Sequence, residues 1–118
     1  MIRIEKEKTG NLIKTFVSDK LTQEDYDQLI PVLEETLENW KNVRWYFEMQ
    51  DFKGWSMGGA FMDMSLGVRH TTDLSKLAMV GEKRWQESLS HLMKPFTTAE
   101  VRFYPLEERE KALEWITS

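Results

Sequence analysis

Apolar and polar side chains alternate in short stretches of the chain, which is the pattern expected of half-buried β-strands. In the first stretch, Ile2 and Ile4 alternate with charged residues. The sequence Thr9-Gly10-Asn11 that follows is typical of a tight turn, so the first two strands should form a hairpin. Strands are predicted at residues 2–5, 12–17, 43–49, 76–80 and 100–104.

Helices are predicted where apolar residues recur every three or four positions. The stripe from Tyr26 to Trp40 is introduced by Thr22, a good N-cap, and by Asp25, which suits the acidic position of a capping box. Pro31 lies inside this stripe and lacks a backbone donor, so we expect a kink or a restart there. Further helices are predicted to begin at Ser56, Gly81 and Leu106.

The stretch from Val43 to His70 is the centre of the prediction, with an aromatic strand, a bend at Gly54 and a helix. Residues 50–55 are interpreted as a loop after the strand, and residues 19–22 as leaving the sheet. The element order β-β-α-β-α-β-α-β-α predicts one α/β domain over residues 1–118. Its sheet should be five-stranded and mostly parallel, with about four helices and an antiparallel strand at one edge.

Composition narrows the class of function. The chain of 118 residues, 41% hydrophobic and 31% charged, suits one globular domain rather than a disordered segment. A net charge of −4 argues against nucleic acid as a partner. The chain has no cysteine, which excludes disulfides and thiolate metal sites. Because no signal-peptide pattern and no apolar run of about 20 residues is present, we expect a cytoplasmic protein without an integral membrane segment.

Three groups of residues carry a resemblance to a known family. They are Asp51-Phe52-Lys53-Gly54-Trp55 leading to Asp63 and His70, then residues 77–85, then residues 93–96 followed by 100–104 and 112–116. With these residues and the predicted element order, the chain resembles the small stand-alone SpoIIAA-like proteins of bacteria. The resemblance implies the STAS fold, which is shared with anti-sigma-factor antagonists, sulfate-transporter tails and, more distantly, CRAL-TRIO lipid-transfer domains. It implies no settled function.

The same resemblance makes Ser56 a possible phosphosite. Anti-sigma-factor antagonists have a phosphorylatable serine where the third strand enters its helix, and Ser56 occupies that place. The residue before it is Trp55 rather than aspartate, and the second hydroxyl residue of that pattern is missing. An N-cap, whose hydroxyl accepts a hydrogen bond from the first helical turn, is the structural alternative for Ser56.

The sequence spacing of the candidate serine, aspartate and histidine residues disfavours catalytic and metal sites. Ser56, Asp63 and His70 are seven residues apart. On a helix this separates successive members by about 10.5 Å along the axis, too far for a proton relay. His70 and His91 have no second ligand at metal spacing. We therefore predict no metal, no cofactor and no catalytic residue. The rival hypothesis is a small enzyme that uses Asp63, His70 or Lys83 as acid or base.

The predicted helix after Ser56 has features of a contact surface. Gly58 and Gly59 each cost about 0.5–1 kcal/mol relative to alanine, a cost that close approach to another surface would offset. Met62 and Leu66 lie on a flank turned away from the predicted sheet contact. Either a large neighbour covers this flank, or the flank binds a ligand or a second copy of the chain.

The sequence therefore predicts a non-enzymatic STAS-like module that binds a partner protein or a small apolar, lipid-like ligand, and that forms a homodimer. The alternatives are the enzyme above and an anti-sigma-antagonist-type regulator switched at Ser56. The predicted contact surface consists of Phe52, Lys53, Trp55, Ser56, Met62 and Leu66.

Overall fold

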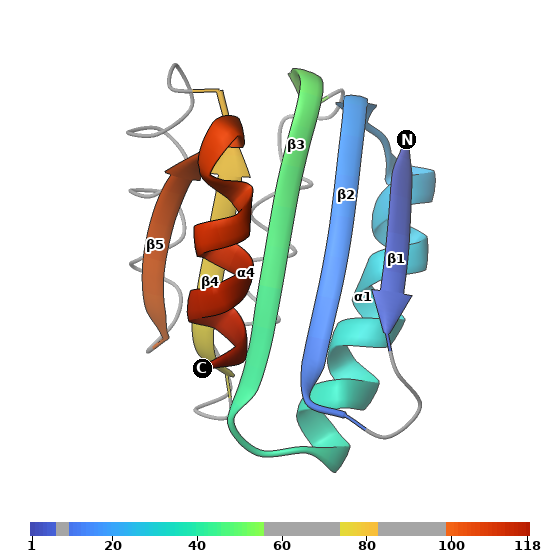
Figure 1. The fold of residues 1–118 in the computed structure, drawn as a ribbon. Helices are drawn as coiled ribbons and strands as arrows, with labels where there is room; N and C mark the ends of the chain where they lie inside the picture. The colour runs from blue at the N-terminus through green and yellow to red at the C-terminus, as the bar shows by residue number, and fades with distance from the viewer. Residues whose placement is uncertain (7–9, 56–73, 83–98) are drawn as a thin grey trace.

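The computed structural model describes residues 1–6, 10–55, 74–82 and 99–118, and in these ranges the chain forms a five-stranded sheet. The strands are β1 (Ile2–Lys6), β2 (Leu12–Leu21), β3 (Val43–Trp55), β4 (Leu74–Gly81) and β5 (Glu100–Pro105). They lie side by side in the order of the sequence, with β1 and β5 at the two ends (Figure 1). β1 is antiparallel to β2, whereas the other three neighbouring pairs are parallel.

The predicted α/β class, the five strands and the antiparallel edge strand are confirmed. The prediction of a mostly parallel sheet is corrected, because the hairpin at the start of the chain makes the sheet mixed. The described ranges contain two α-helices rather than about four, α1 (Gln23–Asn39) and α4 (Arg109–Thr117), and a 3-10 turn η3 (Leu106–Glu108) precedes α4. The helices predicted after Ser56 and after Gly81 lie outside the described residues.

The start of α1 agrees with the prediction. Thr22 Oγ1 accepts a hydrogen bond from the Asp25 N–H at 3.3 Å, and Asp25 Oδ2 accepts one from the Thr22 N–H at 2.9 Å, which completes a capping box. Tyr26 and Leu29 of the predicted stripe are buried. The helix runs through Pro31 as one element, so the predicted restart is wrong. Pro31 is exposed, so water can hydrate the carbonyl that it leaves without a helical donor.

Acid should weaken this cap. Burial alone would raise the pKa of Asp25, but hydrogen bonds from the Thr22 backbone, the Met1 amino group and the Thr22 hydroxyl bring the pKa below its ordinary value of 3.8. A carboxyl group with a depressed pKa stabilises the folded state above its unfolded pKa, and this stabilisation is lost as the pH falls through the folded value. At pH 7 the parent chain should therefore be about 1 kcal/mol more stable than Asp25→Asn.

Urea unfolding of both proteins between pH 7 and pH 2.5 measures this difference. It should be constant near neutral pH and should shrink as the pH falls below about 4. A difference that is the same at both ends of the range would show that the Asp25 charge does not contribute to the cap.

Apolar side chains are buried on both faces of the sheet, and α1 and α4 lie on opposite faces (Figure 1). The larger cluster, on the α1 side, includes Trp45 of β3 and Leu29 of α1. α4 packs against β3, β4 and β5 on the other face. The buried residues of the hydrophobic cluster on the α4 side are Tyr46, Ala78, Val80, Ala112 and Ile116.

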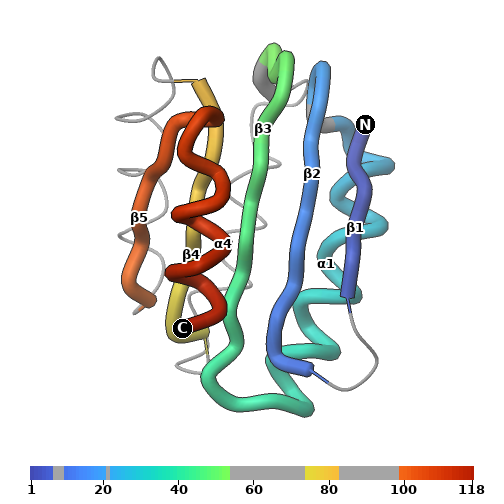
Figure 2. The backbone as a smooth tube through the Cα atoms, in the orientation of Figure 1, coloured from blue at the N-terminus to red at the C-terminus, as the bar shows by residue number. Residues whose placement is uncertain are grey.

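β2 and β3 are longer than predicted. They run side by side to their carboxyl ends, where Leu21 lies opposite Trp55 (Figure 2). Residues 19–21 stay in the sheet and residues 50–55 continue β3, so the predicted exit from the sheet and the predicted loop are both wrong. The polar character of these residues does not end the strands.

Two aspartates account for the irregularity of these strand ends. Asp19 has a φ of 56° and Asp51 a φ of 52°, a left-handed conformation that aspartate tolerates better than most residues. The pairing of β2 with β3 shifts its register next to Asp19. An extra residue of this kind moves the side-chain alternation of a strand by one position. Phe52 therefore joins Met49 on the α1 side of the sheet, and both side chains are buried there.

Candidate functional site

The structure separates the residues of the predicted contact surface. Phe52 is 1% exposed and belongs to the α1-side core, so its assignment to a contact surface is corrected. Lys53 is exposed, and its Nζ lies 3.8 Å from Asp19 Oδ1. Trp55 is paired with Leu21 in the sheet rather than placed on a loop. Ser56, Met62 and Leu66 lie outside the described residues, as do Asp63, His70 and Lys83.

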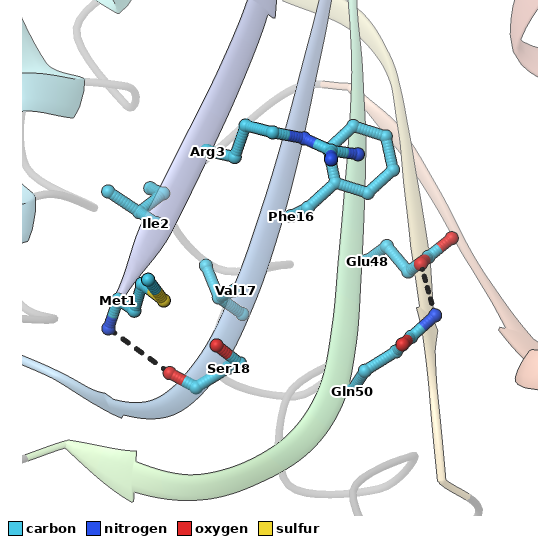
Figure 3. A pocket seen from close by; sticks show the side chains of 8 residues that line it. All are labelled: Met1, Ile2, Arg3, Phe16, Val17, Ser18, Glu48 and Gln50. Atoms are coloured by element: carbon cyan, nitrogen blue, oxygen red, sulfur yellow. Dashed lines mark hydrogen bonds between the residues drawn. The ribbon is translucent and has the colours of Figure 1, made fainter.

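A pocket of about 490 Å³ lies where β1, β2 and β3 meet (Figure 3). It follows one row of directly opposed residues, in which Arg3 of β1 faces Phe16 of β2, and Phe16 faces Glu48 of β3. The row continues through Val80 to Tyr104, on the half of the sheet where α4 packs. The pocket occupies the other half of this face. Its lining residues are Met1, Ile2, Arg3, Phe16, Val17, Ser18, Glu48 and Gln50.

Phe16 is the central apolar residue of the pocket. The guanidinium carbon of Arg3 lies 4.4 Å from the centre of the Phe16 ring, a cation–π contact. Figure 3 shows the Arg3 and Phe16 side chains together in the pocket. On its other side the Phe16 ring contacts Tyr46, with ring centres 5.9 Å apart. The Arg3 charge is shared with Glu5 of the same strand, at 3.7 Å. These contacts hold Phe16 in place as an apolar surface between the charged side chains of Arg3 and Glu48.

Glu48 is a buried acid in the wall of the pocket, with a side chain only 6% exposed. Its Oε1 accepts a hydrogen bond from the Tyr46 hydroxyl at 2.5 Å, and its Oε2 accepts one from Gln50 Nε2 at 2.8 Å. In the part of the chain that the structure describes, the nearest cation is Arg109 at the start of α4, whose Nη1 lies 3.8 Å from Oε2. A buried carboxylate requires such partners, because the loss of its hydration is costly.

Burial raises the pKa of Tyr46 far above its ordinary value of 10, and the hydrogen bond and the negative charge of Glu48 raise it further. Tyr46 therefore keeps its proton at physiological pH and acts as a hydrogen-bond donor. It cannot serve as a general base or as a phenolate nucleophile at this pH. Its structural effect is to fix the orientation of the Glu48 carboxylate.

A second group of charged side chains lies at the carboxyl end of α4. The Arg102 guanidinium and the Lys76 ammonium both contact the Trp115 ring, at 4.6 Å and 5.2 Å from its centre. Lys76 Nζ also donates to the Trp115 carbonyl at 3.3 Å. Cations stabilise the carbonyl end of a helix, so we assign this group to the docking of α4.

Within the described ranges, no cluster of three or more histidine, cysteine, aspartate or glutamate side chains is suited to a metal ion. None of the helices in those ranges combines the length and the hydrophobicity needed to cross a lipid bilayer.

The sequence analysis did not predict any of the residues that line the pocket. The clearest indication in the sequence was Glu48, the one acid in the aromatic run Trp45-Tyr46-Phe47-Glu48-Met49. Alternation alone assigns such an acid to a solvent-facing side of the strand. Only the packing of α4 beside it shows that Glu48 is buried at the edge of a pocket.

Comparisons with known proteins agree with the fold. A family model described as SpoIIAA-like matches residues 12–117. Among solved structures, the chain is similar to a protein of Shewanella loihica PV-4 that is described as uncharacterised and as having a SpoIIAA-like fold. The two are 28% identical with a TM-score of 0.72, over 98% of this chain and 92% of that chain. The sequence matches no curated protein.

Proposed function

The chain belongs to the SpoIIAA-like family, and from this premise we propose that it is a non-enzymatic STAS-like module that binds a small, largely apolar ligand. The observation that carries the proposal is the pocket over β1, β2 and β3. Family membership gives the fold, and the ligand is argued from the side chains of this pocket.

The size and the chemistry of the pocket support ligand binding. Its volume of about 490 Å³ falls within the range of roughly 300–1,000 Å³ that is usual for small-molecule sites. Phe16 supplies the apolar surface of the pocket, and Glu48 and Gln50 supply polar groups at one wall. An apolar lining with a few fixed polar groups is typical of a site that binds by burial and selects by hydrogen bonding.

The polar wall favours binding over catalysis. Tyr46 stays protonated, so the dyad of Tyr46 and Glu48 presents a fixed acceptor rather than a nucleophile with its base. Arg3 is engaged with the Phe16 ring and with Glu5. A fixed acceptor at Glu48 and an engaged arginine at Arg3 are suited to binding a ligand rather than to catalysing a reaction.

Three parts of the predicted function remain predictions. They are phosphorylation of Ser56, binding of a partner protein and formation of a homodimer. Ser56, Met62 and Leu66, which contribute to the predicted surface, lie outside the described residues. Sedimentation of the parent protein at high micromolar concentration tests the homodimer, and a monomer under these conditions would exclude it.

Titration with 2-phenylethanol, followed by the amide NMR spectrum, tests the proposed function. The largest shifts should fall on the amides around Phe16 and Glu48. Ser18→Trp, which fills the pocket with a large ring, should weaken binding roughly tenfold or more. Glu38→Trp is the matched control, because Glu38 is exposed on α1 at a distance from the pocket.

Two outcomes would contradict the proposed function. One is equal binding by the parent protein and by a folded Ser18→Trp variant. The other is a set of shifts that lies away from the pocket. If Ser18→Trp does not fold, Gln50→Trp blocks the same pocket from an exposed position and gives the same test.

A further inference from the structure

Within residues 1–6, 10–55, 74–82 and 99–118, the charge of Glu48 is only partly compensated. Its two hydrogen-bond partners, Tyr46 and Gln50, are neutral. The nearest cation among the described residues, Arg109, lies 3.8 Å away with a side chain that is 51% exposed, so water screens its charge. A carboxylate accepts up to about four hydrogen bonds. Glu48 therefore retains the capacity to bind a charged donor from the pocket.

Gln50 occupies the position that such a donor would take. Its amide donates to Glu48 Oε2 at 2.8 Å, whereas the Gln50 residue as a whole is exposed at the edge of the pocket (Figure 3). An exposed side chain can rotate away at little cost in packing. An ammonium group adds to its hydrogen bond a Coulomb attraction to the carboxylate, which the neutral amide of Gln50 lacks. This attraction favours exchange of the Gln50 amide for an ammonium group.

Distances across the sheet set the shape of the ligand. Glu48 and Phe16 are directly opposed on neighbouring strands, so their backbones are about 5 Å apart. A group bound at Glu48 thus places its next few carbon atoms beside Phe16, next to the Arg3 guanidinium that lies over the ring. Arg3 lies one strand further, with its charge shared with Glu5 at 3.7 Å.

We infer that the pocket selects a small amphipathic amine, whose ammonium group replaces the Gln50 amide on Glu48 and whose apolar body lies beside Phe16. This inference rests on the proposed function, since it names the ligand class of the same pocket. Glu48 is the residue that determines specificity, and Gln50 is a neutral donor that closes the acceptor when no ligand is bound.

Three probes of matched size test the inference by calorimetry at pH 7: 2-phenylethylamine, 2-phenylethanol and 3-phenylpropanoate. The amine should bind roughly tenfold more tightly than the alcohol, because only the amine brings a positive charge to the Glu48 carboxylate. Glu48→Gln should erase this preference. Glu38→Gln, which removes an exposed charge from α1, should keep it.

Gln50→Ala provides a second test that does not alter the buried acid. It removes the competing donor, so the amine should bind severalfold more tightly, and the ratio of amine to alcohol affinity should rise. This variant still tests the preference of the pocket for an amine if Glu48→Gln fails to fold.

The remaining outcomes separate the inference from the proposed function. Equal binding of amine and alcohol in the parent protein would overturn the inference and leave the proposed function intact. Tightest binding of 3-phenylpropanoate would also overturn it, because the carboxylate would then pair with Arg3. Failure of all three probes to bind would overturn the proposed function itself.

Discussion

Replacement of Phe52 by alanine is expected to lower the free energy of unfolding by about 3–5 kcal/mol. The ring is 1% exposed and packs in the α1-side core, so its removal leaves a cavity among well-packed neighbours. Urea unfolding followed by tryptophan fluorescence measures the change.

Lys53→Ala is the matched control at the adjacent position. The Lys53 side chain is 69% exposed, and its ion pair with Asp19 spans 3.8 Å at the surface. Exposed pairs of this kind contribute about 0–1 kcal/mol. Equal, small effects of the two substitutions would mean that Phe52 lies at the surface, as the sequence pattern had indicated, and that the bulge at Asp51 does not redirect it.

Replacement of Trp45 by alanine should cost a comparable amount, about 3–5 kcal/mol. The indole is fully buried at 0% exposure, and its ring meets Phe47 edge-on with ring centres 5.7 Å apart. Its Nε1–H donates to Thr15 Oγ1 at 3.1 Å, across β3 and β2. The substitution removes both the packed ring and this buried hydrogen bond.

Thr15→Val separates these two contributions. It retains the volume of the side chain but leaves the indole N–H without its acceptor, which should cost about 1–3 kcal/mol. A Thr15→Val variant as stable as the parent protein would show that the hydrogen bond contributes nothing, and the effect at Trp45 would then come from packing alone.

The sequence predicted well those features that depend on neighbouring residues. The capping box of α1 needs only Thr22 and Asp25, three positions apart, and it forms as expected. The ends of β2 and β3 depend instead on pairing between distant segments. Asp19 and Asp51 interrupt the alternation in a way typical of loops, yet backbone hydrogen bonding between the two strands keeps both in the sheet.

The sequence pattern could not predict the pocket, because the pocket depends on the register of three strands. Arg3, Phe16 and Glu48 are far apart in the chain and meet only when β1, β2 and β3 pair as they do. The pocket also depends on α4, which packs on the β3, β4 and β5 half of the same face. The hydrophobic periodicity of β1, β2 or β3 does not show which part of the sheet α4 covers.

A crystal structure of the protein soaked with 2-phenylethylamine tests the central claim most directly. We predict that the amine nitrogen lies within hydrogen-bonding distance of Glu48 Oε2, with the phenyl ring beside Phe16 and the Gln50 side chain moved away from Glu48. A ligand bound outside the pocket, or one inside it with the ammonium directed to solvent and Gln50 still bonded to Glu48, would contradict the account.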